Sequence, residues 1–229
     1  MQTNVQGHII KRYDAELQKL EKRVLKMGEL VREQLDRVQL AILEEQVDVA
    51  QSIIDADRPI DVLELKVDKL IIKMIARRSP IGGDLRFIVA ASRMVSDIER
   101  IGDEASNMAQ SLIEEKRSHS EPNNKAAYDE VSALTRLASQ LFEKSLIAFG
   151  EASLVKAQEI AFGGAGADGE LHARLAALTE LTLKQQGDIA EVFNLVLAIR
   201  SLERIVGHIQ NIGEHVIYLI SGEDVRHQH

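Results

Sequence analysis

Residues 83–107 read GDLRFIVAASRMVSDIERIGDEASN, and residues 187–211 read GDIAEVFNLVLAIRSLERIVGHIQN. When the chain is shifted by 104 residues, the two stretches align without a gap and share six identical residues. The identities fall at the same points of what is, in both stretches, the pattern of an amphipathic helix, so duplication explains them better than chance. The sequence therefore predicts two copies of one helical unit.

Apolar residues outside these stretches recur at alternating steps of three and four residues, which is the spacing of a helical seam. The first such seam covers about residues 17–41 and is interrupted at Gln34. A second helix is interrupted at Pro59, which is tolerated in a first helical turn but not in a helix interior, so we place a break just before it. Residues 79–83 end this helix, and Asp84 is expected to be the N-cap of the third.

The third helix should turn one apolar face toward a core and end at a polar linker over residues 116–124. The residues expected on that buried face are Phe87, Val95, Ile98, Ile101, Ala105, Met108 and Leu112. Helical patterns resume after the linker and are interrupted near Gly150 and by a glycine-rich segment at 163–169. We therefore predict an all-α fold of two tandem three-helix bundles related by internal duplication, with spectrin-repeat-like helices, over residues 8–117 and 122–222, and a tail over residues 223–229.

The composition agrees with long helices and excludes several classes of site. The 229 residues include no Cys, no Trp and three Pro, and 3% are aromatic. Without cysteine there are no disulfides, thiolate zinc sites or cysteine nucleophiles. The formal net charge of −8 argues against binding to nucleic acid, which needs a basic surface. No apolar run is long enough to span a bilayer and no signal peptide is visible, so we expect a cytoplasmic location.

Acidic residues are the most informative polar feature. Asp57, Asp61, Glu64 and Asp68 are spaced four, three and four residues apart, which places them on one face of a helix. Glu99 and Asp103 repeat the four-residue step on the third helix. Two such stripes on adjacent helices would offer carboxylate oxygens to a hard cation such as Fe³⁺, Mg²⁺ or Mn²⁺. The alternative is a solvated face neutralised by nearby basic side chains, namely Lys66, Lys69 and Arg100.

Other polar patterns indicate no catalytic site. The sequence has no Glu-x-x-His, His-Glu-x-x-His or Gly-x-Ser-x-Gly pattern. The string Gly164-x-Gly166-x-x-Gly169 follows a helical rather than a strand pattern, so a flexible loop explains it better than a nucleotide site. His208 and His215 lie seven residues apart on one helical face and are expected to be surface or interface residues more than ligands. We expect a protein that is not an enzyme.

Several longer motifs resemble those of the PhoU family of phosphate-transport regulators. In the first half these are residues 79–86, SPIGGDLR, and residues 97–103, DIERIGD, followed by Asn107. In the second half they are RSLERI at 200–205, NIGE at 211–214 and GEDVRH at 222–227. The resemblance covers nearly the whole chain, with both sets of motifs in order.

The resemblance implies a fold of two three-helix bundles and a cytoplasmic negative regulator of phosphate uptake and of the phosphate-starvation response. Its partners would be the ATPase of the high-affinity phosphate ABC transporter and a sensor histidine kinase, and it would approach the membrane only through them. It would bind no nucleic acid, and it could form a homodimer or another homo-oligomer.

The resemblance also implies metal binding, because the family's Glu/Asp-x-x-x-Asp motifs bind iron clusters or divalent substitutes such as Mg, Mn, Zn or Ni. The residues it assigns to metal are Asp57, Asp61, Glu64, Asp68, Glu99, Asp103, Asp168 and Glu203. The second half departs from the pattern, because Gly207 stands where the family has an Asp and Gly164 where it often has another acid. We therefore expect a weaker second site, and we keep as an alternative a purely structural helical adaptor without metal.

Overall fold

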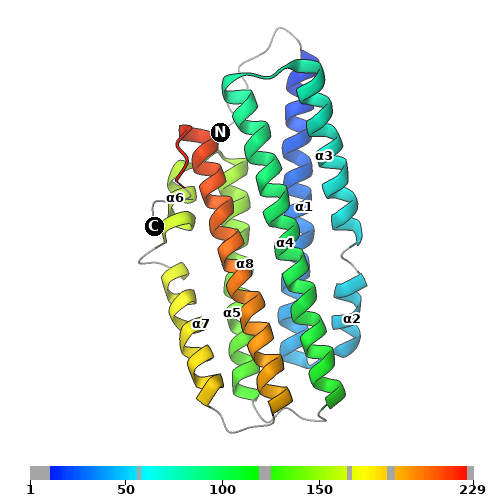
Figure 1. The fold of residues 1–229 in the computed structure, drawn as a ribbon, viewed down its shortest axis with the longest axis vertical. Coiled ribbons are helices and arrows are strands. Elements are labelled where there is room, and N and C mark those ends of the chain that lie inside the picture. The colour runs from blue at the N-terminus through cyan, green and yellow to red at the C-terminus, as the bar shows by residue number, and fades with distance from the viewer. Residues whose placement is uncertain (1–10, 56–57, 119–124, 164–166, 185–188, 226–229) are drawn as a thin grey trace.

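The computed structural model describes residues 11–55, 58–118, 125–163, 167–184 and 189–225, and these residues form eight α-helices and no strand (Figure 1). The predicted all-α class is confirmed. The helices of the first half are α1 (Lys11–Glu44), α2 (Val47–Asp55), α3 (Arg58–Arg78) and α4 (Gly82–Ser118). Those of the second half are α5 (Lys125–Gly150), α6 (Leu154–Phe162), α7 (Ala167–Lys184) and α8 (Ile189–Ser221).

The two halves repeat one order of helix lengths. Each begins with a long helix, continues with a helix of 9 residues and one of intermediate length, and ends with a helix of more than 30 residues. This order is what an internal duplication predicts. The duplication itself, and the division into bundles at 8–117 and 122–222, stay predictions.

The break predicted before Pro59 is present, since α2 ends at Asp55 and Pro59 is the second residue of α3. The predicted N-cap of the third helix was wrong. Ser79 and Gly82 both have positive φ and complete the reversal of the chain, so helical structure starts at Gly82. Asp84 thus lies in the first turn of α4, where a carboxylate still complements the helix dipole.

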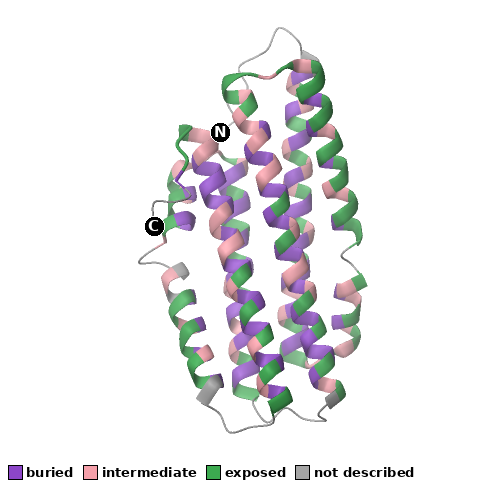
Figure 2. Ribbon diagram, in the orientation of Figure 1, coloured by how far each residue is buried: buried purple, intermediate pink, exposed green. Residues whose placement is uncertain are grey.

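The four long helices form the centre of the molecule (Figure 1). The most extensive contact joins α4 to α8, and the next joins α1 to α5, so helices in equivalent positions of the two halves pack on one another. α2 and α3 flank this centre on one side and α6 and α7 on the other. Buried residues lie on the faces that the long helices turn toward each other (Figure 2), and the hydrophobic ones belong to one cluster shared by both halves.

The predicted buried face of the third helix is correct except at Phe87. The other six residues are buried in α4, whereas Phe87 is partly exposed and stacks on Phe149 of α5 with ring centroids 6.0 Å apart. The interruption of the first seam also has a structural reason. Gln34 is buried, and its amide donates to the Ser106 hydroxyl at 3.0 Å and to the Ile53 carbonyl at 3.4 Å. A polar link between α1, α2 and α4 therefore replaces an apolar contact at this level.

None of the described helices combines the length and the apolar content that crossing a membrane requires.

Candidate metal-binding face

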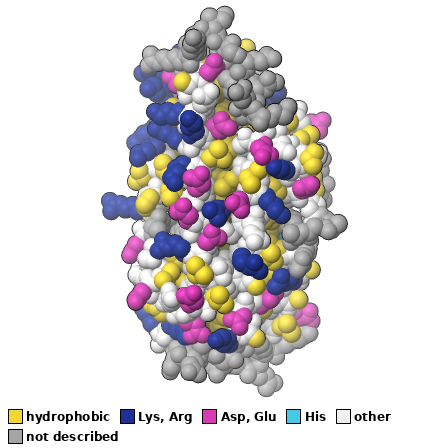
Figure 3. Space-filling view, turned by 180° about the vertical axis from the view of Figure 1, so that it is seen from behind, with side chains coloured by type: hydrophobic (Ala, Val, Ile, Leu, Met, Phe, Trp, Pro, Cys, Tyr) yellow, Lys and Arg dark blue, Asp and Glu magenta, His cyan; other side chains and the backbone are white. Residues whose placement is uncertain are grey.

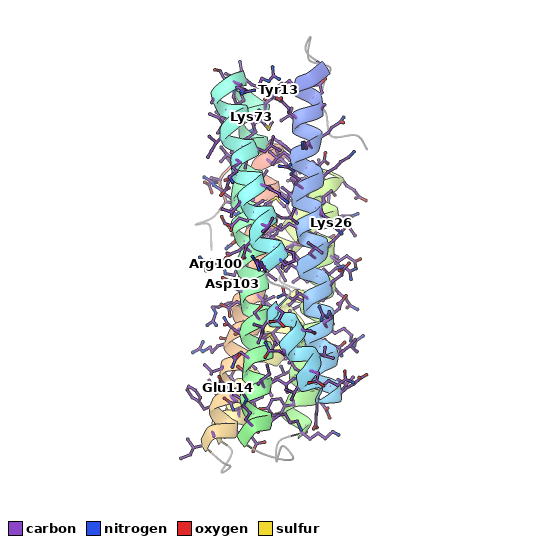
Figure 4. All side chains as sticks on the ribbon, turned by 90° about the vertical axis from the view of Figure 1, so that its right-hand side faces the viewer. Tyr13, Lys26, Lys73, Arg100, Asp103 and Glu114 are labelled. Atoms are coloured by element: carbon purple, nitrogen blue, oxygen red, sulfur yellow. The ribbon has the colours of Figure 1, made fainter. Side chains whose placement is uncertain are left out.

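The carboxylates predicted on the second and third helices lie on α3 and α4, which are in contact. We call Asp61, Glu64, Asp68, Glu99 and Asp103 the first-half acidic face. Figure 4 places Asp103, beside Arg100, midway along the molecule on the side where α3 begins. Asp57, also predicted to belong here, lies outside the described residues.

Electrostatic interactions show that the acids of the two helices converge. Burial, the Asp103 carboxylate and the Glu64 carboxylate together raise the pKa of Glu99 to about 7, against the partial compensation of Arg100. The pKa of Glu64 is raised by burial first, then by Asp68 and Asp61. Asp103, from the neighbouring helix, contributes to the same rise. Glu64, Glu99 and Asp103 therefore lie within range of one another's charge, while Asp61 and Asp68 lie on the exposed side of α3.

Arg100 is the counterion of this face. Its guanidinium donates to the Asp103 carboxylate at 3.0 Å and lies 3.4 Å from the Glu99 carboxylate. The Arg100 side chain is 62% exposed, so it can leave these acids without disturbing the core. Among the described residues, no three His, Asp or Glu side chains are gathered closely enough to hold a metal ion.

The chemical type of the donor atoms on this face nevertheless suits a hard cation. They are carboxylates, and the pKa of Glu99 is raised first by burial and then by the charges of Asp103 and Glu64, which Arg100 opposes. A cation on this face would need the carboxylates of Glu64, Glu99 and Asp103 to turn toward one point and Arg100 to swing away.

In the second half, fewer of the predicted donor side chains lie within the described residues. Glu203 of α8 forms an ion pair with Arg200 at 2.8 Å. Four residues further along α8, a β-carbon on Gly207 would point into open space. Asp168 lies on the backbone of α7, but its side chain is outside the described residues. In the described part of the second half, Glu203 is therefore the one predicted ligand whose side chain can be placed.

A polar cluster that the sequence did not predict joins α4 to α8. The Asp97 carboxylate is 2.8 Å from a ring nitrogen of His208 and 2.8 Å from one of His215, and it accepts a hydrogen bond from Asn211 at 3.1 Å. Burial alone would raise the pKa of Asp97, but these three partners lower it to about 2. His208 and His215 are thus interface residues. The sequence could have indicated a polar cluster here, since positions 208, 211 and 215 share one face of α8.

A second ion pair across the same interface joins Arg204 of α8 to Glu104 of α4. The Arg204 guanidinium donates two hydrogen bonds to the Glu104 carboxylate, at 2.6 and 2.7 Å. Arg100 is the residue that the 104-residue shift equates with Arg204. One of the two equivalent arginines therefore binds acids of its own helix, and the other ties α8 to α4.

Comparison with known proteins places this arrangement in a family. A model described as the PhoU domain matches residues 24–112. The phosphate-specific transport system accessory protein PhoU homolog of Pseudomonas aeruginosa is 34% identical over 220 residues, which cover 96% of this chain and 90% of that protein.

Solved structures agree with the sequence comparison. The crystal structure of PhoU from Pseudomonas aeruginosa superposes with a TM-score of 0.84 at 31% identity and covers 92% of this chain and 100% of that one. The phosphate transport system regulatory protein PhoU from Streptococcus pneumoniae gives a TM-score of 0.82 at 27% identity, with 93% and 99% covered. On the repeated motifs, the fold and these nearly full-length likenesses, the chain belongs to the PhoU family.

Proposed function

We propose that this protein is the accessory protein of a phosphate-specific transport system and restrains phosphate uptake when phosphate is plentiful. The observation that carries the proposal is likeness over nearly the whole chain, at 34% identity, to a protein named as an accessory protein of such a transport system. In this role it acts in the cytoplasm on the ATPase of the phosphate ABC transporter and on a sensor histidine kinase, and it performs no chemical step itself.

The first-half acidic face is the proposed metal site. Its support is that Glu64 of α3 and Glu99 and Asp103 of α4 repel one another electrostatically, in addition to the burial that raises the pKa of Glu64 and Glu99. Iron or a divalent cation bound there would remove the repulsion between these carboxylates and so stabilise the fold by mass action. The alternative is an adaptor without metal, and the observation that favours it is the pair of contacts from Arg100 to Glu99 and Asp103.

A clean deletion in the native host tests the regulatory role. We expect a reporter of the phosphate-starvation response to stay on in phosphate-rich medium and to be repressed again when the wild-type chain is supplied in trans. Normal repression in the deletion strain would contradict the proposal. Co-purification of the tagged chain with the transporter ATPase and with the kinase, each tested alone, checks the partners separately from the response.

Metal content distinguishes a metal site on the first-half acidic face from an adaptor without metal. Protein purified without chelator, then freed of loosely bound ions by gel filtration, is expected to retain metal, and Asp103→Ala is expected to lose most of it. Ser96→Ala, an exposed position on the same helix, is the matched control. Metal-free wild-type protein that still restores repression would support the adaptor.

A further inference from the structure

Helices α1 and α5, one from each half, pack antiparallel behind α4 and α8 (Figure 1). The Ser139 hydroxyl of α5 donates to the Asp36 carboxylate of α1 at 2.6 Å, and Gly28 of α1 lies opposite Leu146 of α5. A β-carbon on Gly28 would be 2.5 Å from the Leu146 side chain, so the glycine lets Leu146 lie against the backbone of α1. Beside this close approach, a groove of about 460 Å³ lies between the two helices.

The groove has an apolar lining. Leu146 is buried, Leu25 is half-buried and Ile147 is 41% exposed. Most of the other lining residues are exposed, so the groove is open to solvent. An open groove between two helices is suited to the side chains of a docked segment, whereas a small-molecule site encloses most of its ligand.

The polar residues of the groove are mostly acidic. The charged lining residues are four glutamates and one arginine, namely Glu29, Glu33, Glu143, Glu151 and Arg32. Nearby basic side chains pair along their own helix, since Lys26 lies 3.4 Å from Glu29 and Arg32 lies 2.9 Å from Asp36. Arg32 is thus drawn to an acid outside the groove.

Two carboxylates of the groove keep no counterion. Glu33 of α1 and Glu143 of α5 are exposed, and neither forms an ion pair or a hydrogen bond with the residues that the structure describes. Because they come from the two helices that form the groove, they can contact an occupant from both sides. Figure 3 looks at the molecule from behind and shows acidic side chains close to apolar ones in the central part of this face.

The charge of the groove selects its occupant. Acidic side chains repel nucleic acid, anionic lipid and acidic peptides. A second copy of this chain, related by a two-fold axis through the groove, would set the same acids against each other. A basic amphipathic helix has the complementary chemistry, because residues three or four positions from an apolar side chain lie on either side of it and can carry the positive charges.

We propose that the groove between α1 and α5 docks a basic amphipathic helix of another protein, with an aliphatic side chain in the groove and cationic side chains beside Glu33 and Glu143. Such a helix contacts both halves of the chain at once. The proposal goes beyond the regulatory role and does not involve bound metal. Its tests use purified protein and synthetic peptides, so their failure would leave the regulatory role untouched.

A synthetic peptide is the first probe. We expect a fluorescein-labelled peptide of Leu and Lys, with about 18 residues and all leucines on one helical face, to bind the full chain in fluorescence anisotropy at physiological salt. A scrambled peptide of the same composition keeps the charge but has no apolar face, and it should bind about tenfold more weakly or worse. Equal affinity for the two peptides would overturn the proposal, because charge alone would then explain the binding.

Charge removal locates the binding site. The double variant Glu33→Gln, Glu143→Gln should bind the amphipathic peptide about tenfold more weakly than wild type. Asp48→Asn, Glu114→Gln removes the same charge from exposed positions on α2 and α4 and is the matched control. Equal weakening by both pairs would refute the groove as the site. A change in self-association with unchanged peptide binding would assign the groove to a second copy and overturn the proposal.

The apolar contact has its own test. Ile147→Ser should weaken peptide binding while circular dichroism shows an unchanged helix content. Val155→Ser, at a 65% exposed apolar position on α6 that does not line the groove, is the control and should bind as wild type does. Unchanged affinity in Ile147→Ser would contradict the proposed anchor.

A fluorescent label reports where the peptide binds, because the chain has no cysteine of its own. Glu29→Cys and Asp48→Cys each introduce one thiol, at the groove and on α2, for an environment-sensitive fluorophore. The label at position 29 should respond to the amphipathic peptide, and the label at position 48 should not. A response at position 48 alone would place the peptide elsewhere and overturn the proposal.

Discussion

The Asp97 carboxylate of α4 and the His208 imidazole of α8 lie 2.8 Å apart. The 104-residue shift that relates the two halves carries Asp97 onto Ser201 and Glu104 onto His208, and Ser201 and Glu104 are themselves in hydrogen-bond contact. The two positions that the shift equates thus contact each other twice, once with the first position on α4 and the second on α8, and once the other way round. Reciprocal contacts of this kind are the signature of an isologous interface. Here the interface lies within one chain.

Removing the Asp97 carboxylate should destabilise the protein. Asp97→Ala deletes the common acceptor of His208, Asn211 and His215, and it leaves His215 buried without this partner. We expect a loss of about 2–4 kcal/mol in the free energy of unfolding. Urea denaturation followed by circular dichroism measures it, and Ser96→Ala is the exposed control. A change below about 0.5 kcal/mol would show that the cluster is energetically neutral.

The same carboxylate should give stability a specific dependence on acid. Because the folded pKa of Asp97 is about 2 and the ordinary value is 3.8, its contribution is complete above pH 3.8 and is lost as the pH falls toward 2. The contribution is expected to be about 2 kcal/mol. Asp97→Asn should flatten the stability curve in this range. Identical acid profiles for the variant and wild type would contradict the assignment.

Unequal metal binding by the two halves follows from their carboxylates. Asp103→Ala should remove most bound metal and lower the melting temperature in its presence, whereas Glu203→Ala should change little, because Glu203 has no described carboxylate partner. Gly207→Asp should raise the stoichiometry, since a side chain there meets open space. Elemental analysis combined with anomalous scattering checks both sites. Equal occupancy of the two faces, or metal near Glu203 alone, would refute the expected order.

Two glycines of α8 should respond in opposite ways to alanine. A β-carbon at Gly213 would lie 3.0 Å from the Ala157 carbonyl oxygen and 3.0 Å from the Ala161 nitrogen, both backbone atoms of α6. Gly213→Ala should therefore push α6 away and destabilise the fold by about 1–3 kcal/mol. Gly207→Ala, in open space on the same helix, should stabilise it by up to about 1 kcal/mol. Thermal unfolding compares the pair, and destabilisation by both would disprove the packing argument.

The ion pair between Glu104 and Arg204 should contribute a measurable coupling energy. It is bidentate, with a Glu104 side chain that is 12% exposed and an Arg204 side chain that is 52% exposed. A double-mutant cycle with Glu104→Gln and Arg204→Gln should give about 1 kcal/mol, decreasing at high salt. Arg200→Gln and Glu203→Gln, which break an exposed pair within α8, form the comparison cycle. Equal coupling energies in both cycles would show that an ion pair between the two halves contributes no more than an ion pair within one helix.

The secondary structure could be read from the sequence because it depends on local spacing. The seam of α1, the break at Pro59 and the buried face of α4 follow from apolar periodicity and from the chemistry of proline. The error at Asp84 arose because helix starts depend on the turn before them, and the positive φ values of Ser79 and Gly82 are not encoded in composition. Gln34 was visible as an interruption, but its partner Ser106 was not, since 72 residues separate them.

The sequence by itself determined the all-α class, the family and the two acidic stripes, because each rests on residue types at short, regular separations. Only the tertiary structure decided that α4 packs on α8 and that Asp97 is the partner of His208 and His215. It also decided that Glu64 and Glu99 repel each other electrostatically while Arg100 opposes part of this repulsion. The physical reason is the range of the interactions. Helix formation and amphipathicity are set within a few turns, whereas the pKa of a carboxylate and the partner of a buried side chain depend on which helices pack together. The pairing of the helices is the arrangement of lowest free energy. That free energy sums many weak contacts over the whole core, so no single segment of the chain specifies the pairing.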